Sequence, residues 1–198
     1  MKKMIWLTTL SILFLLFIVP GILASALDMI PANDQPGYDS NKRLSIYGEK
    51  EILQKFVSRD KNLTAIGTSI RNPNLKNQKE IILNLYDKDK NLIRSSILSG
   101  KNIEDGDFVK FVFQFVPDSS GKEYSFTLSS LDAGPGETIE VFIIEPTVDI
   151  IDYFYAEETH PGGIPMVTFH KPNSKWEIVK MVYSNWLSRL LSLGSQKI

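Results

Sequence analysis

Apolar and polar residues alternate in short runs from about Glu51 onward, and segments rich in Asn, Asp, Gly and Pro separate these runs. Alternation with a period of two is typical of a β-strand with one buried and one solvated face. The pattern predicts seven strands, at residues 52–57, 63–70, 80–86, 92–98, 107–115, 123–130 and 138–144, and a further one at 166–170. Because no helical period separates the first seven, we expect an all-β antiparallel β-sandwich of jelly-roll or immunoglobulin-like topology.

The strand predicted at 107–115 carries phenylalanine at three alternate positions, Phe111, Phe113 and Phe115, so all three face the same side. They either fill the core or form a flat platform for a sugar ring. The strands at 80–86 and 123–130 also have an apolar face that requires a partner layer. Sugar platforms more often use Tyr or Trp, whose polar group suits a half-wet surface. We therefore assign the three phenylalanines to the core.

Residues 173–193 follow a 3.6-residue period instead, which predicts an amphipathic helix capped by Asn173 or Ser174. The stripe predicted to lie at the membrane interface contains Trp176, Val179, Trp186 and Leu190. Charged residues within the same segment make a membrane-spanning helix costly. A helix docked on the sandwich or an oligomer contact explains the same stripe, so these alternatives stay open.

The N-terminal segment combines Lys2 and Lys3 with an uncharged, mostly apolar run over residues 4–27. Positive charge stays on the cytoplasmic side, so we expect the rest of the chain to be extracytoplasmic. A run of about 24 residues is long enough for a single-pass transmembrane anchor, which requires roughly 20. The alternative is a signal peptide cleaved after Ala26, at the Ala24-Ser25-Ala26 site, which would release a secreted protein.

These patterns divide the chain into four parts. We expect residues 1–27 to form the membrane anchor or signal peptide, 28–50 an irregular spacer, 51–172 the β-sandwich domain and 173–193 the amphipathic helix. The spacer is predicted from its turn-favouring residues, which include two prolines and a glycine between residues 31 and 37.

The 198-residue chain has a formal net charge of -1 and no cysteine. The charge argues against nucleic-acid binding by the whole chain. The lack of cysteine excludes disulfides, a thiolate nucleophile and cysteine-bound zinc. The two histidines, His160 and His170, form no metal-binding motif, and no catalytic motif occurs. We therefore predict a non-catalytic protein without a cofactor.

Acidic residues occur in several predicted turns, namely Asp87, Asp89, Glu104, Asp105, Asp107, Glu157 and Glu158. Two of these acids could act as a glycosidase pair, but spacing along a β-fold does not report their separation in space. The Asp-x-Asp pairs at 87–89 and 105–107 could instead supply oxygen ligands to a structural calcium ion. We interpret most of these acids as solvated loop residues.

Two motifs lie within the predicted sandwich. They contain Gln54 and Phe56 before an Asn62-Leu63-Thr64 turn, and Pro117, Asp118, Ser119, Gly121, Lys122 and Tyr124 after the aromatic strand. In these motifs the region 53–144 resembles the extracytoplasmic β-sandwich attached to many prokaryotic membrane glycosyltransferases and envelope-polysaccharide proteins. The resemblance implies a jelly-roll fold similar to carbohydrate-binding modules. It implies no catalysis, because the glycosyltransferase part has no counterpart in these residues.

The resemblance further implies glycan binding or support of envelope-polysaccharide assembly, with a glycan and membrane lipid as partners. The candidate glycan-stacking residues are Tyr86, Tyr153 and Tyr155, which lie near predicted strand ends or in loops. If residues 153–155 are extended, Tyr153 and Tyr155 face one side and Phe154 faces the other. The alternative function is a structural or assembly subunit that binds protein partners through a sheet face or the C-terminal helix.

Overall fold

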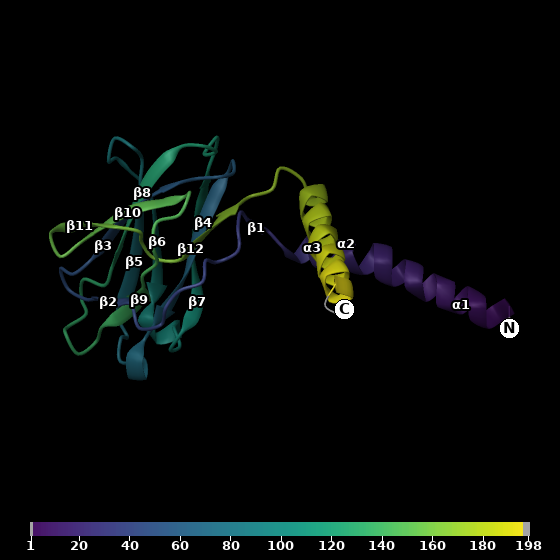
Figure 1. Ribbon diagram of the computed structural model, residues 1–198, viewed down its shortest axis with the longest axis horizontal. Helices are drawn as coiled ribbons and strands as arrows, with labels where there is room; N and C mark the ends of the chain where they lie inside the picture. The colour runs from purple at the N-terminus through teal and green to yellow at the C-terminus, as the bar shows by residue number, and fades with distance from the viewer. Residues whose placement is uncertain (1, 196–198) are drawn as a thin grey trace. The chain divides into compact units, whose positions relative to one another are not determined.

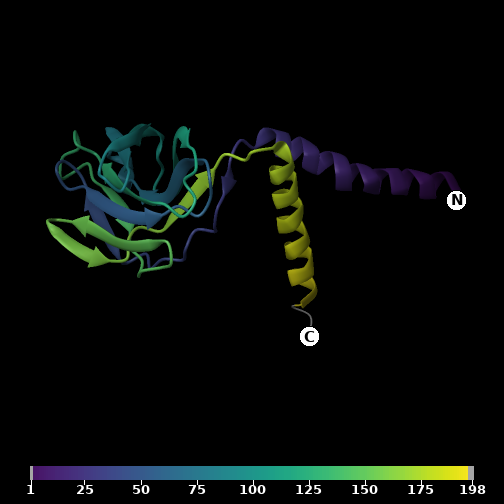
Figure 2. The same cartoon turned by 90° about the horizontal axis from the view of Figure 1, so that it is seen from above.

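The computed structural model describes residues 2–195, which divide into two compact units. Residues 31–170 form a β-sandwich, and the described residues 2–30 and 171–195 form a helical unit. Figures 1 and 2 show the strands gathered in the sandwich, with the C-terminal helix α3 drawn in yellow.

The strands of the sandwich belong to two sheets. They are β1 (Ile30–Pro31), β2 (Arg43–Ile46), β3 (Ile52–Val57), β4 (Leu63–Arg71), β5 (Glu80–Tyr86), β6 (Leu92–Ser99), β7 (Asp107–Val116), β8 (Glu123–Ser129), β9 (Ile139–Phe142), β10 (Ile150–Tyr155), β11 (Glu158–Pro161) and β12 (Met166–His170). Sheet 1 has the order β1-β12-β4-β9-β2, with β7 also paired to β4. Sheet 2 has the order β11-β10-β3-β8-β5-β6.

Consecutive strands pass repeatedly from one sheet to the other, since β3, β5, β8 and β10 lie in sheet 2 while β4, β7, β9 and β12 lie in sheet 1. Every described pairing that has a register is antiparallel. The β10–β11 hairpin, green in Figures 1 and 2, lies at one edge of sheet 2. The prediction of an all-β, antiparallel sandwich is confirmed.

The core lies between the two sheets and is rich in phenylalanine. Phe56, Phe111 and Phe126 are fully buried, Phe113 is 7% exposed, and Phe115 is half-buried near the end of β7. Along β7, buried residues alternate with exposed ones from Phe108 onward. The assignment of Phe111 and Phe113 to the core is therefore confirmed.

The seven strands predicted first are present, and their ends differ from the predicted ends by no more than two residues. The prediction of an irregular spacer over residues 28–50 is wrong, because β2 lies within it. β2 pairs with β9, and its last residue, Ile46, is fully buried in the core. The Arg-Leu-Ser-Ile sequence of β2 does alternate, but four residues beside a turn-rich segment give only a weak strand signal.

The N-terminal half of the helical unit is helical from Lys2 to Ala26. The α-helix α1 (Lys2–Leu13), the π-helical segment η1 (Phe14–Ile18) and the α-helix α2 (Val19–Ala26) follow one another without a gap. Large apolar side chains on this run are exposed, among them Trp6 (70%), Leu7 (65%) and Leu15 (61%). Within residues 2–195, no single helical element combines the length and the apolar character needed to cross a membrane.

The other half of this unit is α3 (Lys175–Ser195), which packs on α2. Ile178 is fully buried against Ala24 and Ile30, and Val179 and Val182 pack beside this small cluster. The backbone N–H of Asn173 donates to Glu177 Oε2 at 2.8 Å, which stabilises the start of the helix.

Candidate functional site

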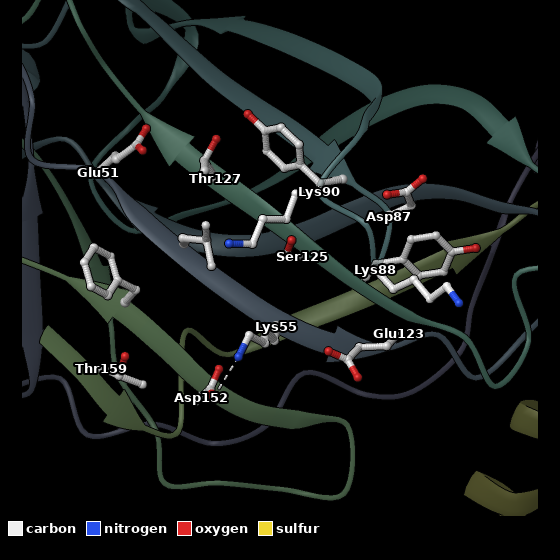
Figure 3. A pocket seen from close by; sticks show the side chains of 14 residues that line it. Glu51, Lys55, Asp87, Lys88, Lys90, Glu123, Ser125, Thr127, Asp152 and Thr159 are labelled. Carbon is white, nitrogen blue, oxygen red and sulfur yellow. Dashed lines mark hydrogen bonds and ion pairs between the residues drawn. The ribbon is translucent and has the colours of Figure 1, made fainter. Parts of the chain in front are cut away.

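A groove with a cavity volume of about 580 Å³ crosses the outer face of sheet 2 (Figure 3). Its lining side chains come from β3 and the residue before it, from β8, β10 and β11, and from the end of β5 and the turn that follows it. They are Glu51, Leu53, Lys55, Tyr86, Asp87, Lys88, Lys90, Glu123, Tyr124, Ser125, Thr127, Asp152, Phe154 and Thr159. We call this surface the sheet 2 groove.

The strand register places an apolar strip across the middle of the groove. Phe154 pairs with Leu53, and Leu53 pairs with Thr127 on its other side. Thr159 extends the same row onto β11, and Asn84 continues it onto β5. Phe154 is 44% exposed, so its ring is available to a ligand. The row therefore combines an apolar surface with hydroxyl and amide groups.

A second row, two residues further along the strands, is polar and charged. Lys55 pairs with Ser125, and Ser125 pairs with Tyr86. Lys55 Nζ also forms an ion pair with Asp152 Oδ2 at 3.3 Å, drawn as a dashed line in Figure 3. The groove thus presents alternating donors and acceptors beside the apolar strip.

The turn from Asp87 to Asn91 closes one end of the groove. Asp87 Oδ1 accepts hydrogen bonds of 2.9 Å from the backbone N–H groups of Asp89 and Asn91, and Asn91 Nδ2 donates to Oδ2 at 3.1 Å. The bonds from the Asn91 side chain and backbone hold the pKa of Asp87 below its ordinary value. The carboxylate of Asp87 therefore builds the turn that carries Lys88 and Lys90.

The three predicted stacking tyrosines lie in three different environments. Tyr86 is half-buried and lines the groove. Tyr153 is only 8% exposed and stacks on His160 with ring centroids 5.1 Å apart. Tyr155 is half-buried, and its hydroxyl donates to the carbonyl oxygen of Ser45 at 2.8 Å. Of these three tyrosines, only Tyr86 lines the groove, because the side of β10 that carries Tyr153 and Tyr155 faces the core.

The sequence did place Tyr153 and Tyr155 on the side of the strand opposite to Phe154, as the structure shows. The selection of tyrosines by residue type missed Phe154, which is the exposed aromatic side chain of this strand. Leu53 and Lys55 were also missed. Their signal was present, because they alternate with the buried residues Gln54 and Phe56.

Two of the other acids singled out in the sequence, Asp105 and Asp107, accept local hydrogen bonds. Both carboxylate oxygens of Asp105 accept hydrogen bonds of 2.9 Å from Arg71, and Asp107 Oδ2 accepts one from the backbone N–H of Glu104. Among residues 2–195, no three or more acidic or histidine side chains lie together as a metal site would require. Of the suggested calcium ligands, Asp87 and Asp107 accept hydrogen bonds within turns, and Asp105 forms an ion pair with Arg71.

The motif residues in the two turns bind to each other. Ser119 is fully buried, and its hydroxyl donates to the carbonyl oxygen of Asp60 at 2.7 Å while accepting from the backbone N–H of Leu63 at 3.0 Å. The N–H of Gly121 donates to the Ser58 carbonyl oxygen at 2.7 Å. Gly121 has a φ of 72°, which favours glycine there. Ser119 and Gly121 are therefore structural and do not line the groove, whereas the motif residue Tyr124 does.

Gln54 is the motif residue with the deepest position. It is fully buried, and its Oε1 accepts a hydrogen bond of 2.6 Å from the backbone N–H of Ile164. Its Nε2 donates to the Ile164 carbonyl oxygen at 3.4 Å. A Cβ at Gly163 would lie 2.5 Å from Gln54 Oε1, so glycine is required for this approach. Gln54 therefore joins β3 to the segment that leads into β12.

The residues predicted to lie at a membrane interface differ in their exposure along α3. Trp176 and Trp186 are 73% and 46% exposed, whereas Val179 is half-buried beside the cluster with α2. The side chain of Leu190 lies outside the part of the chain whose side chains the structure describes. Val179 and Val182 pack beside the cluster that Ile178 forms with Ala24 and Ile30, whereas Trp186, one turn beyond Val182 on the same side of α3, is uncovered.

The chain was also compared with known proteins. No model of a known protein family matches it, and no curated protein matches it by sequence.

Proposed function

We propose that this chain is a membrane-anchored extracytoplasmic module that binds a glycan without converting it, and that it supports envelope-polysaccharide assembly. The observation that carries the proposal is the sheet 2 groove. A sugar ring has apolar C–H faces and a rim of hydroxyl groups. Leu53 and Phe154 offer an apolar surface to the C–H face of the sugar. Ser125, Thr127 and Thr159 offer hydroxyl groups to its rim.

The fold that we propose is a jelly roll of the carbohydrate-binding-module type. Two features support it. The strands cross repeatedly between the sheets, and the groove lies on an open sheet face. The structural roles of Gln54 and Ser119 are compatible with motifs that define a shared sandwich and leave its ligand free to vary.

We assign the run from Lys2 to Ala26 to a retained anchor. Its exposed apolar side chains suit lipid, and the run has about the length that a bilayer core requires. Contacts from α3 support retention over cleavage. Ala24 is 1% exposed in its cluster with Ile178, and Lys175 Nζ donates to the carbonyl oxygen of Leu27 at 2.9 Å. The predicted cleavage site is thus flanked by contacts with α3, although Ala26 and Leu27 themselves are exposed.

The exposed part of α3 is assigned to the membrane surface. Trp176 and Trp186 are exposed, and tryptophan favours the interface because its ring is apolar while its N–H remains near water. Lipid is therefore a partner of the helical unit in this proposal.

A glycan array tests the binding function. The full chain, purified in detergent micelles, should bind one family of acidic or neutral bacterial polysaccharides above the level of a micelle-only control. Silence across all of the arrayed glycans would overturn the proposal.

A second candidate function is binding of a protein partner. The outer face of sheet 1 favours it, because Phe108 is 39% exposed and Val112 is 50% exposed on β7. Lys110 lies over the ring of Phe169 at 4.8 Å on the same face. If no glycan on the array binds the chain, binding of a protein partner becomes the stronger candidate function.

A further inference from the structure

We infer that the sheet 2 groove selects acidic glycans, and that Lys90 and Lys55 bind the anionic group of the sugar. This inference rests on the proposed glycan-binding function and names the ligand class of the same site. The anionic group is a carboxylate or a phosphate, since both offer oxygen acceptors to an ammonium donor.

Lys90 is placed in the groove by the turn after β5. It has a φ of 64°, and its backbone N–H donates to the carbonyl oxygen of Asp87 at 3.0 Å, so the backbone that carries it is held in a tight turn. Figure 3 shows its side chain extending over the sheet beside Ser125, with the ammonium inside the groove. Among the described residues, no carboxylate forms an ion pair with this ammonium.

Lys55 enters the same part of the groove from β3. Its side chain is 46% exposed, and it meets one oxygen of Asp152. An ammonium has three N–H donors, so a second acceptor can be bound without loss of that pair. Two ammonium groups from different elements therefore face one space (Figure 3).

The lining of the groove carries four carboxylates, on Glu51, Asp87, Glu123 and Asp152, against three lysines, so the placement of these charges decides where an anion can bind. Asp152 is paired with Lys55, and Asp87 is surrounded by the N–H groups of its own turn. Glu123 pairs with Val57 at the start of β8, two residues along the strands from the pair of Lys55 and Ser125. Lys90 is therefore the position in the groove where an added anion is expected, because no carboxylate of the described residues forms an ion pair with its ammonium.

Matched pairs of oligosaccharides test this inference in the full chain in micelles. One pair is an oligogalacturonate and its methyl ester, and the other is a phosphorylated oligomannoside and its dephosphorylated form. We expect the charged member of one pair to bind at least about tenfold more tightly than its neutral partner, a difference of about 1.4 kcal/mol. The pair that shows this difference in affinity identifies the bound anionic group as a carboxylate or a phosphate. The preference should weaken as sodium chloride is raised, because salt screens exposed charges.

The variant Lys90→Gln should lose most of this preference while its affinity for the neutral member changes little. Lys101→Gln is the matched control, because Lys101 is an exposed lysine outside the groove. Equal affinity for charged and neutral members would overturn the inference and leave the proposed function standing. Binding of no acidic or neutral glycan at all would overturn both. A charge preference that Lys90→Gln and Lys55→Gln leave intact would also contradict the assignment.

Discussion

Gln54 is a polar side chain in an apolar core, and its hydrogen bonds to Ile164 explain why the core tolerates it. Replacing it removes the acceptor of a buried backbone N–H, which water cannot reach. The same substitution at an exposed strand position should have little effect, because solvent replaces the lost hydrogen bonds.

We therefore predict that Gln54→Leu lowers the free energy of unfolding by about 1–3 kcal/mol. Gln114→Leu on β7, where the side chain is exposed, should change it by less than about 0.5 kcal/mol. Thermal or urea unfolding of the full chain in micelles measures both. Equal effects of the two substitutions would show that the buried hydrogen bonds of Gln54 do not stabilise the sandwich.

Asp105 makes the stability of the sandwich depend on pH. The hydrogen bonds from Arg71, followed by its positive charge, hold the pKa of Asp105 below the ordinary value of aspartate. A lowered pKa in the folded chain means that the stabilisation is present above the unfolded pKa, about 4, and is lost as pH falls through the folded pKa.

Asp105→Asn should therefore be less stable than the natural chain at neutral pH, and the difference should shrink as the pH is lowered below about 4. Melting temperatures of the two proteins across an acid pH series give this difference directly. The expected size is small, because both partners are partly exposed. A difference that grows on acidification would contradict the assigned direction of the pKa shift.

Residue type and position in a strand give different information about a candidate site. The three tyrosines were selected as aromatic residues near predicted strand ends or loops, and this criterion found Tyr86 in the groove. It also selected Tyr153, which is buried. The alternation along β10 separates Tyr153 from Phe154 correctly, but only the pairing of β10 with β3 shows which side is outside. That pairing joins segments about 100 residues apart and has no local signal.

At the scale of elements, strands with several alternating apolar residues could be predicted to within two residues. β2 and β11 could not, because each has only four residues and little burial contrast. The groove requires the side-by-side order of β10, β3, β8 and β5, which comes from crossings between sheets. The helix α3 was predicted from its period, but its contact with α2 depends on Ile178, which lay outside the predicted stripe.

The element-scale prediction concerns α3 and the membrane. In a full chain that carries Trp6→Phe and Trp176→Phe, Trp186 is the only tryptophan left. Its fluorescence in nanodiscs should be quenched more strongly by lipids brominated near the headgroup than by lipids brominated near the chain end, since tryptophan favours the interface. The matched protein with Trp6→Phe and Trp186→Phe, which retains Trp176, should show the same order of quenching. Absence of quenching by either lipid would contradict the membrane-surface position.

At the scale of the whole molecule, the membrane anchor has its own test. If the run from Lys2 to Ala26 is retained, the intact mass of the protein purified from membranes includes the residues before Leu27. We predict this result because Ile178 packs on Ala24 and Lys175 Nζ donates to the Leu27 carbonyl oxygen, so α3 holds the segment on both sides of the predicted cleavage site. Ile178→Asp should release these contacts and increase the fraction that begins at Leu27. A natural chain that already begins at Leu27 would overturn the anchor and favour a secreted protein.

The central claim is that the sheet 2 groove binds the glycan, and a pair of matched phenylalanine substitutions tests it most directly. Phe154 is 44% exposed in the groove, and Phe108 is 39% exposed on the outer face of sheet 1. The affinity of the full chain for the best array glycan should fall about tenfold for Phe154→Ala and should stay unchanged for Phe108→Ala. Unchanged binding by Phe154→Ala together with loss by Phe108→Ala would contradict the account and move the site to sheet 1.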